Sequence, residues 1–183
     1  MQYFTPDLFV RFQNFQGERA LNAVHAEWDR AIDLYRARLR ELEGILPRSV
    51  RRLVKEFALH DAAILAMERG PRATLTITLR LDPPQPFLLV LTYSLLGDPE
   101  INRSALPAEF RSLTPLWLYD ELDSGGTIPP SSGRTIYTHD ILLSNGWEVK
   151  IQFWKLAVSQ PEALLPAPES TPSSPQAPVS QSA

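Results

Sequence analysis

The 183-residue chain contains no cysteine. Disulfide bridges, thiolate metal ligands, iron–sulfur clusters and cysteine nucleophiles are therefore excluded. The fold must depend on an apolar core instead, and a chain that is 44% hydrophobic and 21% charged can form one of normal size.

Long apolar runs are missing as well. No window approaches the roughly 18 consecutive apolar residues that a membrane-spanning helix requires. The opening MQYFTPDLFV has no basic residue and carries Asp7, which is unlike a secretory signal. These absences predict a cytoplasmic protein with no membrane partner.

A large excess of one charge sign is also missing, because the formal net charge is only −3. Nothing in that balance favours a polyanion, so no nucleic-acid partner is predicted. With eight glycines the chain has little material for a phosphate cradle, and it lacks the G-x-G-x-x-G, phosphate-loop, H-E-x-x-H and G-x-S-x-G motifs. We predict no cofactor and no metal.

The composition divides the chain into three zones. Residues 1–56 are rich in Arg, Glu and Leu, and residues 57–158 in Thr, Val, Ile, Leu and aromatics. Residues 159–183 hold six Pro and six Ser but no Lys, Arg or aromatic residue. Such a composition buries too little apolar surface to offset the entropy of ordering, which predicts a disordered tail. The expected organisation is a single α+β domain over 1–158, with a helical part at 1–56 and a β part at 57–158.

Helical signals fill the first zone. Thr5-Pro6-Asp7 supplies a cap oxygen, a proline whose N–H is not needed and an acid in the first turn. Gly17 then separates a short helix from a long one, and Pro47 can open a third. The long helix carries an apolar stripe, which we expect to be mostly buried together with its aromatic members. The stripe comprises Leu21, Val24, Trp28, Ile32, Tyr35, Leu39 and Leu42.

The second zone has the pattern of antiparallel strands. Residues 74–81, TLTITLRL, alternate without a fault, which predicts one buried and one solvated face. Residues 87–96 are nearly all apolar and predict a central strand covered on both faces. Further strands are expected at 57–67, at 116–122 and in a hairpin around Ser144-Asn145-Gly146, which gives a mostly antiparallel sheet of about six strands. Turns and loops are expected at 82–86, 97–115 and 124–134, with a helical turn near Ala108.

The register of the hairpin follows from which residues share a face. A two-residue loop would set Asp140 opposite Ile151, whereas a three-residue loop with a left-handed glycine at 146 sets Ile141 opposite Val149. The longer loop places the apolar pairs on one face, so we predict it. In that register His139 points to the buried side and Asp140 points outward.

His-Asp occurs twice, at His60-Asp61 and His139-Asp140, although the chain has only three histidines. Each pair falls within an expected strand. If those strands are neighbours, imidazole and carboxylate groups could meet and bind zinc, iron or manganese, or perform acid–base catalysis. Adjacent residues in a strand point to opposite faces, however, so a half-buried structural histidine is the interpretation that we prefer.

The faces of these strands on which the residues lie predict a specific contact. The apolar residues of 57–67 share a face with Asp61, and the hairpin register turns His139 inward. Burial disfavours a charged imidazole unless an acid compensates, and Asp61 can supply that acid if the strand at 57–67 lies beside the strand at 135–143. The alternative phase, with His60, Ala62 and Ile64 on the buried face, has the weaker apolar pattern. We therefore predict a structural, metal-free contact between Asp61 and His139, and we expect an Asp61→Asn variant to be destabilised.

Two further clusters carry polar groups. The segment WLYDELD, residues 117–123, sets three acids beside two aromatics, which could line a cation or sugar site; alternatively, the aromatics pack and the acids meet water. A run of basic residues could bind phosphate, but acids are interleaved with it, so a solvated helix face is preferred. The run comprises Arg36, Arg38, Arg40, Arg48, Arg51, Arg52 and Lys55.

Several of these segments together resemble an uncharacterised family of bacterial proteins of unknown function. The resemblance rests on YFTPDLFVRFQ, HAEWDRAI, LHDAAIL, WLYDELD and HDILLSNGWEVKIQF, and it covers about residues 1–158. It implies no assigned activity and no catalytic residues. It makes the two His-Asp positions landmarks of the family.

The function that these observations favour is a non-enzymatic protein-interaction or immunity-type module, with another protein as its partner. Three observations support this function. The sequence has no cofactor motif, it has no charge bias, and few ionisable residues fall at expected core positions. The alternative is a small metal-dependent or acid–base hydrolase whose residues would be His60, Asp61, His139 and Asp140.

Overall fold

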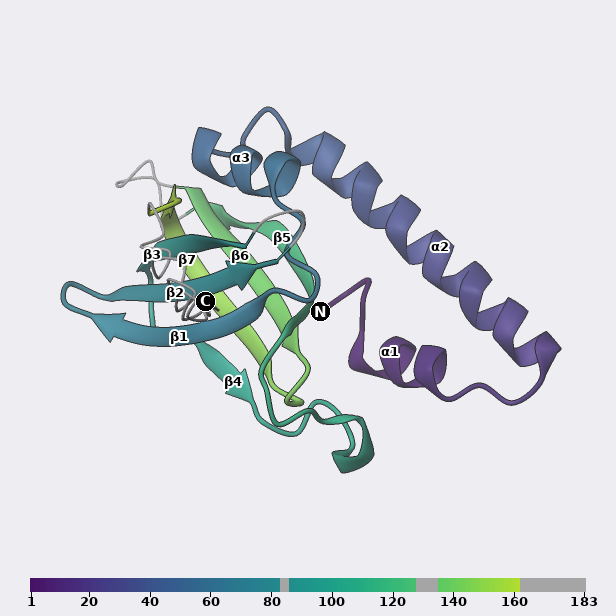
Figure 1. The fold of residues 1–183 in the computed structure, drawn as a ribbon. Coiled ribbons are helices and arrows are strands. Elements are labelled where there is room, and N and C mark those ends of the chain that lie inside the picture. Colours follow the sequence, from purple (N-terminus) through teal and green to yellow (C-terminus); the bar gives the residue numbers. More distant parts are fainter. Residues whose placement is uncertain (83–85, 128–134, 162–183) are drawn as a thin grey trace, which may run out of the picture.

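The computed structural model describes residues 1–82, 86–127 and 135–161, and it has the expected α+β architecture (Figure 1). Three helices at the N-terminal end are packed with an antiparallel sheet. The helices are α1 (Pro6–Gln13), α2 (Glu18–Leu42) and α3 (Arg48–Glu56), with a short 3₁₀ turn at Ala108–Phe110. The strands are β1 (Ala63–Gly70), β2 (Thr74–Leu81), β3 (Phe87–Leu95), β4 (Glu100–Asn102), β5 (Trp117–Thr127), β6 (Thr135–Leu143) and β7 (Glu148–Ser159).

The helices begin where the sequence signals them. Thr5 accepts a hydrogen bond from the N–H of Leu8 and caps α1. Gly17, with a φ of 82°, separates α1 from α2 in a conformation that favours glycine. The stripe of α2 is mostly buried, as expected, since Val24 and Leu42 are buried and its other members are only partly exposed. The first half of α2 extends beyond the sheet and lies beside α1 (Figure 1).

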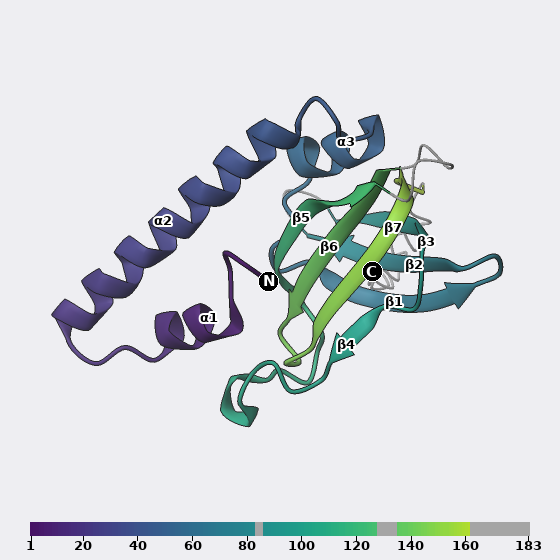
Figure 2. The ribbon, with the colours of Figure 1, turned by 180° about the vertical axis from the view of Figure 1, so that it is seen from behind.

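The strands form an antiparallel sheet in the order β1-β2-β3-β7-β6-β5, and β4 pairs with β7 outside this path. The sheet curls until its edges meet at one end (Figure 2). Ala63, at the start of β1, bridges to Leu116, just before β5. Beside this bridge the N–H of Trp117 donates to the carbonyl of Ala62. The result is a partly closed barrel.

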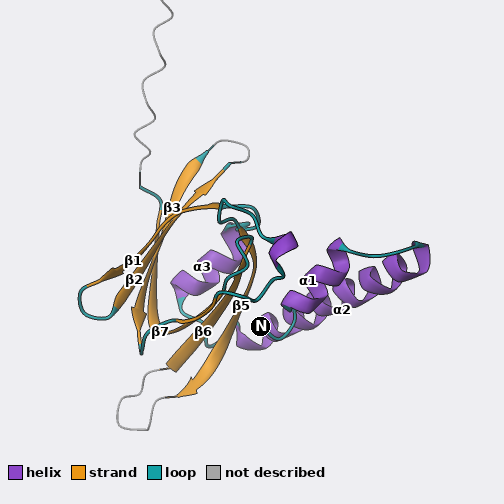
Figure 3. Ribbon diagram, turned by 90° about the horizontal axis from the view of Figure 1, so that it is seen from below, coloured by secondary structure: helices purple, strands orange, loops and turns teal. Residues whose placement is uncertain are grey.

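α3 packs into the concave side of the curled sheet (Figure 3). Val50 and Leu53 of α3 are buried there among inward-facing strand residues such as Ile77 and Phe153. β2 alternates as predicted, with its leucines and isoleucine inward. β3 differs from its prediction, since its second face is half-buried and not covered.

The hairpin of β6 and β7 has the predicted register. Ile141 lies opposite Val149, and Gly146 takes a φ of 85°, the left-handed conformation that the three-residue loop requires. His139 is consequently fully buried, with no exposed surface. The local apolar pattern was therefore sufficient to orient this histidine.

Several boundaries need correction. β1 begins at Ala63, because residues 59–62 form a turn in which Asp61 has a φ of 65°. The strand expected at 57–67 is therefore wrong in its first half. β5 continues to Thr127, through residues expected to be a loop, and the loop at 97–115 contains β4 besides its helical turn. Most of the expected disordered tail, and parts of the expected loops at 82–86 and 124–134, lie outside the described residues.

Candidate functional site

A cleft of about 490 Å³ opens where α2 and α3 face β5. This volume lies within the range of roughly 300–1,000 Å³ that is typical of ligand sites. Besides tyrosines, the ionisable groups that line it are Arg36, His60 and Asp120. The remaining lining residues are apolar or aromatic: Phe4, Ile32, Tyr35, Leu39, Leu53, Val54, Phe57, Leu59, Leu118 and Tyr119.

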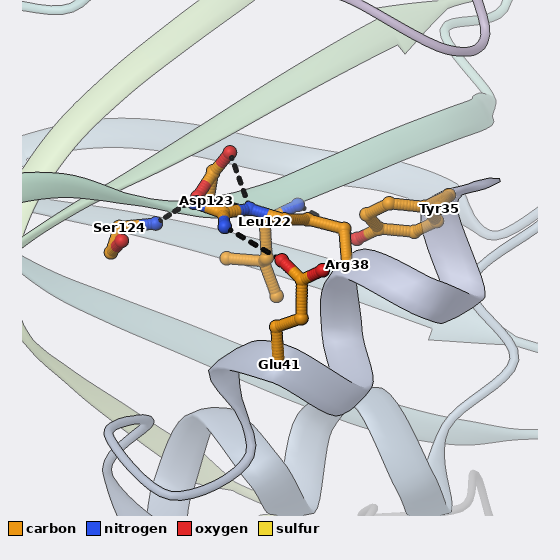
Figure 4. A network of polar contacts seen from close by, with 6 residues as sticks. All are labelled: Tyr35, Arg38, Glu41, Leu122, Asp123 and Ser124. Atoms are coloured by element: carbon orange, nitrogen blue, oxygen red, sulfur yellow. Dashed lines mark hydrogen bonds and ion pairs between the residues drawn. The ribbon is translucent and has the colours of Figure 1, made fainter.

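α2 is held against β5 by two side chains that lie one turn apart (Figure 4). The N–H of Leu122 donates to the hydroxyl of Tyr35 at 2.7 Å. The guanidinium of Arg38 contacts Asp123 Oδ1 at 2.7 Å from Nη2 and at 3.1 Å from Nε. Arg38 also pairs with Glu41 on its own helix at 3.1 Å. These contacts fix the wall of the cleft that α2 forms.

A chain of hydrogen bonds runs from the cleft into the barrel interior. Asp120 Oδ2 lies 2.9 Å from His139 Nε2, and His139 Nδ1 lies 2.9 Å from the hydroxyl of Tyr93. The indole N–H of Trp117 donates to Asp120 Oδ1, also at 2.9 Å. The histidine, tyrosine and tryptophan are fully buried, whereas the side chain of Asp120 is 25% exposed. Asp120 thus connects the cleft with the core.

The carboxylate fixes the tautomer of the histidine. An ionised Asp120 can only accept, so His139 Nε2 carries a hydrogen. With the hydrogen on Nε2, Nδ1 accepts from the hydroxyl of Tyr93. Burial, reinforced by the charge of Asp120, raises the pKa of Tyr93 well above its ordinary value, so this hydroxyl keeps its hydrogen. Each member of the chain is therefore satisfied by another, as a structural buried network requires.

The predicted contact between Asp61 and His139 is wrong. The turn at residues 59–62 moves Asp61 out of the sheet, and its Oδ2 lies 2.9 Å from Nδ1 of the adjacent His60. The side chain of His60 is 50% exposed, and that of Asp61 is 68% exposed. The ring of His60 packs on Tyr119, with centroids 5.0 Å apart. Neighbouring side chains can meet here because these residues form a turn and not a strand.

Asp140 lies on the outer side of the sheet, as the register predicted, opposite Lys150. Burial raises its pKa from the ordinary value of 3.8. It borders a different pocket from the cleft, next to β4. Of the four predicted candidates, His60 lines the cleft, His139 is buried behind it, Asp61 is at the surface and Asp140 is elsewhere.

The acids of residues 117–123 make internal contacts and do not simply meet water. Glu121 is 5% exposed, and its carboxylate accepts the backbone N–H groups of Gln2, Tyr3 and Phe4 at 2.6, 2.7 and 2.7 Å. The expectation that the aromatics pack is confirmed, because Trp117 is fully buried and the ring of Tyr119 packs on Phe4 and Trp28. This segment therefore ties the N-terminal residues and α2 to the barrel.

Two kinds of feature are absent from the described ranges 1–82, 86–127 and 135–161. Within them no three His, Asp or Glu side chains are grouped as a metal ion requires. In that same part of the chain, no helix combines the length and the apolar character needed to cross a membrane.

No protein-family model matches the chain, and no curated protein matches it. The resemblance to an uncharacterised bacterial family therefore stays a prediction.

Sequence reasoning missed the tyrosine hydroxyls of this region. Tyr93 lies within the apolar run 87–96, and Tyr35 lies within the apolar stripe of the long helix. A buried tyrosine hydroxyl normally finds a hydrogen-bond partner, so a tyrosine within an apolar run was a usable signal for a buried polar group. Arg36 carried no signal that separated it from the other basic residues.

Proposed function

We propose that the protein is a non-enzymatic interaction module that holds an apolar side chain of a partner protein in the cleft between α2, α3 and β5. The observation that carries this proposal is the environment of Leu39. Leu39 lines the cleft, is partly exposed, and belongs to none of the apolar clusters that the described residues form. An apolar wall that the protein's own core does not use gains free energy when a partner's apolar group covers it.

The polar groups of the cleft support recognition. Asp120 already accepts hydrogen bonds from buried donors, and His60 is paired with Asp61. Tyr35 accepts from the N–H of Leu122, so its own hydrogen can be donated to an acceptor such as a peptide carbonyl of the partner. Burial raises the pKa of Tyr35, which keeps this donor protonated. An immunity-type protein, which binds and blocks another protein, is one form of such a module.

The hydrolase alternative would need its four residues around one cavity. They occupy separate places, so no observation favours that function over binding.

A peptide-display selection on the full chain tests the proposal, with Leu39→Glu compared with Leu34→Glu. Leu34 lies on the same helix, is 51% exposed and does not line the cleft. We expect the unmodified protein and Leu34→Glu to enrich the same peptides, each with a large apolar residue. Leu39→Glu should bind a selected peptide at least about tenfold more weakly in fluorescence anisotropy, since burying an apolar side chain contributes about 1.5–3 kcal/mol.

Two results would contradict the proposal. One is the failure of the unmodified protein to enrich any apolar peptide. The other is equal affinity of a selected peptide for Leu39→Glu and Leu34→Glu, which would place its binding surface outside the cleft.

A further inference from the structure

A second surface lies where α3 meets the end of β7 (Figure 1). A groove of about 930 Å³ runs between these elements. Ala157 and Val158 of β7 supply accessible apolar lining, whereas Leu156 beside them is buried in the core. Five cations line the groove and one acid, Glu56, accompanies them among its described lining residues; the cations are Arg48, Arg51, Arg52, Lys55 and Lys155.

The four cations of α3 share one face of the helix, because they are spaced at i, i+3, i+4 and i+7. Val50 and Leu53 occupy the buried face. Helix stability does not explain the cation at the start of this helix. Arg48 opens α3, whose first turn holds no acid and whose N-terminus has no side-chain cap. A cation at that end opposes the helix dipole, whereas a bound anion would complement it.

Much of this positive charge is available to a ligand. Internal ion pairs engage Arg52 and Lys55. Arg48, Arg51 and Lys155 are exposed and form no ion pair within the described part of the chain. The whole chain has a net charge of −3, so the groove is a local concentration of positive charge on an acidic protein.

We propose that this groove binds an acidic segment of a partner protein, with carboxylates on the cations and an apolar side chain on the β7 residues. Planar guanidinium groups match carboxylates in bidentate hydrogen bonds. The apolar lining favours a peptide over a free anion, because a peptide can place an apolar side chain beside its carboxylates.

A nucleic acid suits the groove less well. Stacking on aromatic side chains is the usual means of holding single-stranded bases, and the described lining residues include no aromatic. α3 has nine residues and is therefore only about 13.5 Å long, which spans few phosphates.

The test uses the full chain and a short fluorescein-labelled peptide in which Asp and Glu alternate with Leu. We expect binding in fluorescence anisotropy at low ionic strength, and weaker binding as salt is added. Replacing Arg48, Arg51 and Lys155 together by Gln should weaken it about tenfold or more. The control replaces Arg19, Arg30 and Arg72 by Gln, which removes the same charge from exposed positions elsewhere and should change the affinity less than about twofold.

Three outcomes would overturn the proposal: no binding of the peptide to the unmodified protein at about 1 mM, equal binding by the two triple variants, or tighter binding of a single-stranded oligonucleotide of equal charge. Thermal melting by circular dichroism establishes that both triple variants are folded. The salt dependence is measured on the unmodified protein, so it does not depend on the folding of any variant. Leu39→Ala, which brings no new charge beside Arg51 and Lys55, should leave this affinity unchanged, so the groove and the cleft are tested separately.

Discussion

Replacing Asp120 by Asn should destabilise the protein, although the side chain keeps its size and shape. The two carboxylate oxygens accept from His139 Nε2 and from the indole N–H of Trp117. An asparagine amide has one accepting oxygen and an NH₂ group that only donates. In either orientation the NH₂ group therefore faces a donor.

The magnitude follows from the group that is left without a partner. If the amide nitrogen faces His139, the ring can move its hydrogen from Nε2 to Nδ1 and donate it to Tyr93, whose own hydroxyl hydrogen then loses its acceptor. If the amide nitrogen faces Trp117, the indole N–H is unpaired instead. All these side chains are fully buried, and one unsatisfied buried polar group costs about 1–3 kcal/mol.

Asp61→Asn is the matched control, since it makes the same chemical change at the surface. The side chain of Asp61 is 68% exposed, and its φ of 65° suits asparagine as well as aspartate. We expect its free energy of unfolding to stay within about 0.5 kcal/mol of the unmodified protein. This reverses the expectation drawn from the sequence, in which Asp61 was the partner of His139.

Urea unfolding followed by tryptophan fluorescence measures both variants, provided that the m values agree. An Asp120→Asn protein as stable as the unmodified one, or an Asp61→Asn protein that loses more stability than Asp120→Asn, would refute the assignment of this network.

Glu121→Gln should cost about 1–3 kcal/mol, because one amide oxygen cannot accept the three backbone N–H groups that the carboxylate holds, and hydrogen exchange at residues 2–4 should accelerate in NMR spectra. Asp140→Asn should raise stability at pH 7: burial raises the pKa of this carboxyl, so the folded state favours the neutral form, and the gain should vanish in urea unfolding below the ordinary pKa of 3.8. Burial raises the pKa of Tyr93, so its contribution to the stability of the fold is fully present below the ordinary value of 10.0 and is lost at higher pH. The melting temperature should therefore fall above about pH 10, and it should fall less steeply in Tyr93→Phe. Trp28→Ala should cost about 2–3 kcal/mol in urea unfolding, less than a fully buried aromatic, because Trp28 is partly exposed between Phe4 and the ring of Phe12; a loss above about 5 kcal/mol would contradict that placement.

Short-range chemistry was enough to predict most of the elements. α1 begins at Pro6 because Thr5 can cap it, and the alternating TLTITLRL forms β2 because a period of two leaves one face apolar. The inward orientation of His139 was also local, since the apolar pairs of a single hairpin and the left-handed Gly146 determine the register. Each of these results depends on residues within a few positions of one another.

The partners of those residues depend on the tertiary structure. β6 lies between β7 and β5, not beside β1, so Asp120 reaches His139 and Asp61 does not. The left-handed turn at Asp61 ended the expected strand early, and no periodicity in the sequence signals it. Packing all the strands and helices at once produces the curl of the sheet and the position of α3. It also produces the cleft and the groove that border α3. Residues distant in sequence come together there because the free energy gained by burying their apolar faces outweighs local conformational preference. The sequence of a single segment does not contain this information.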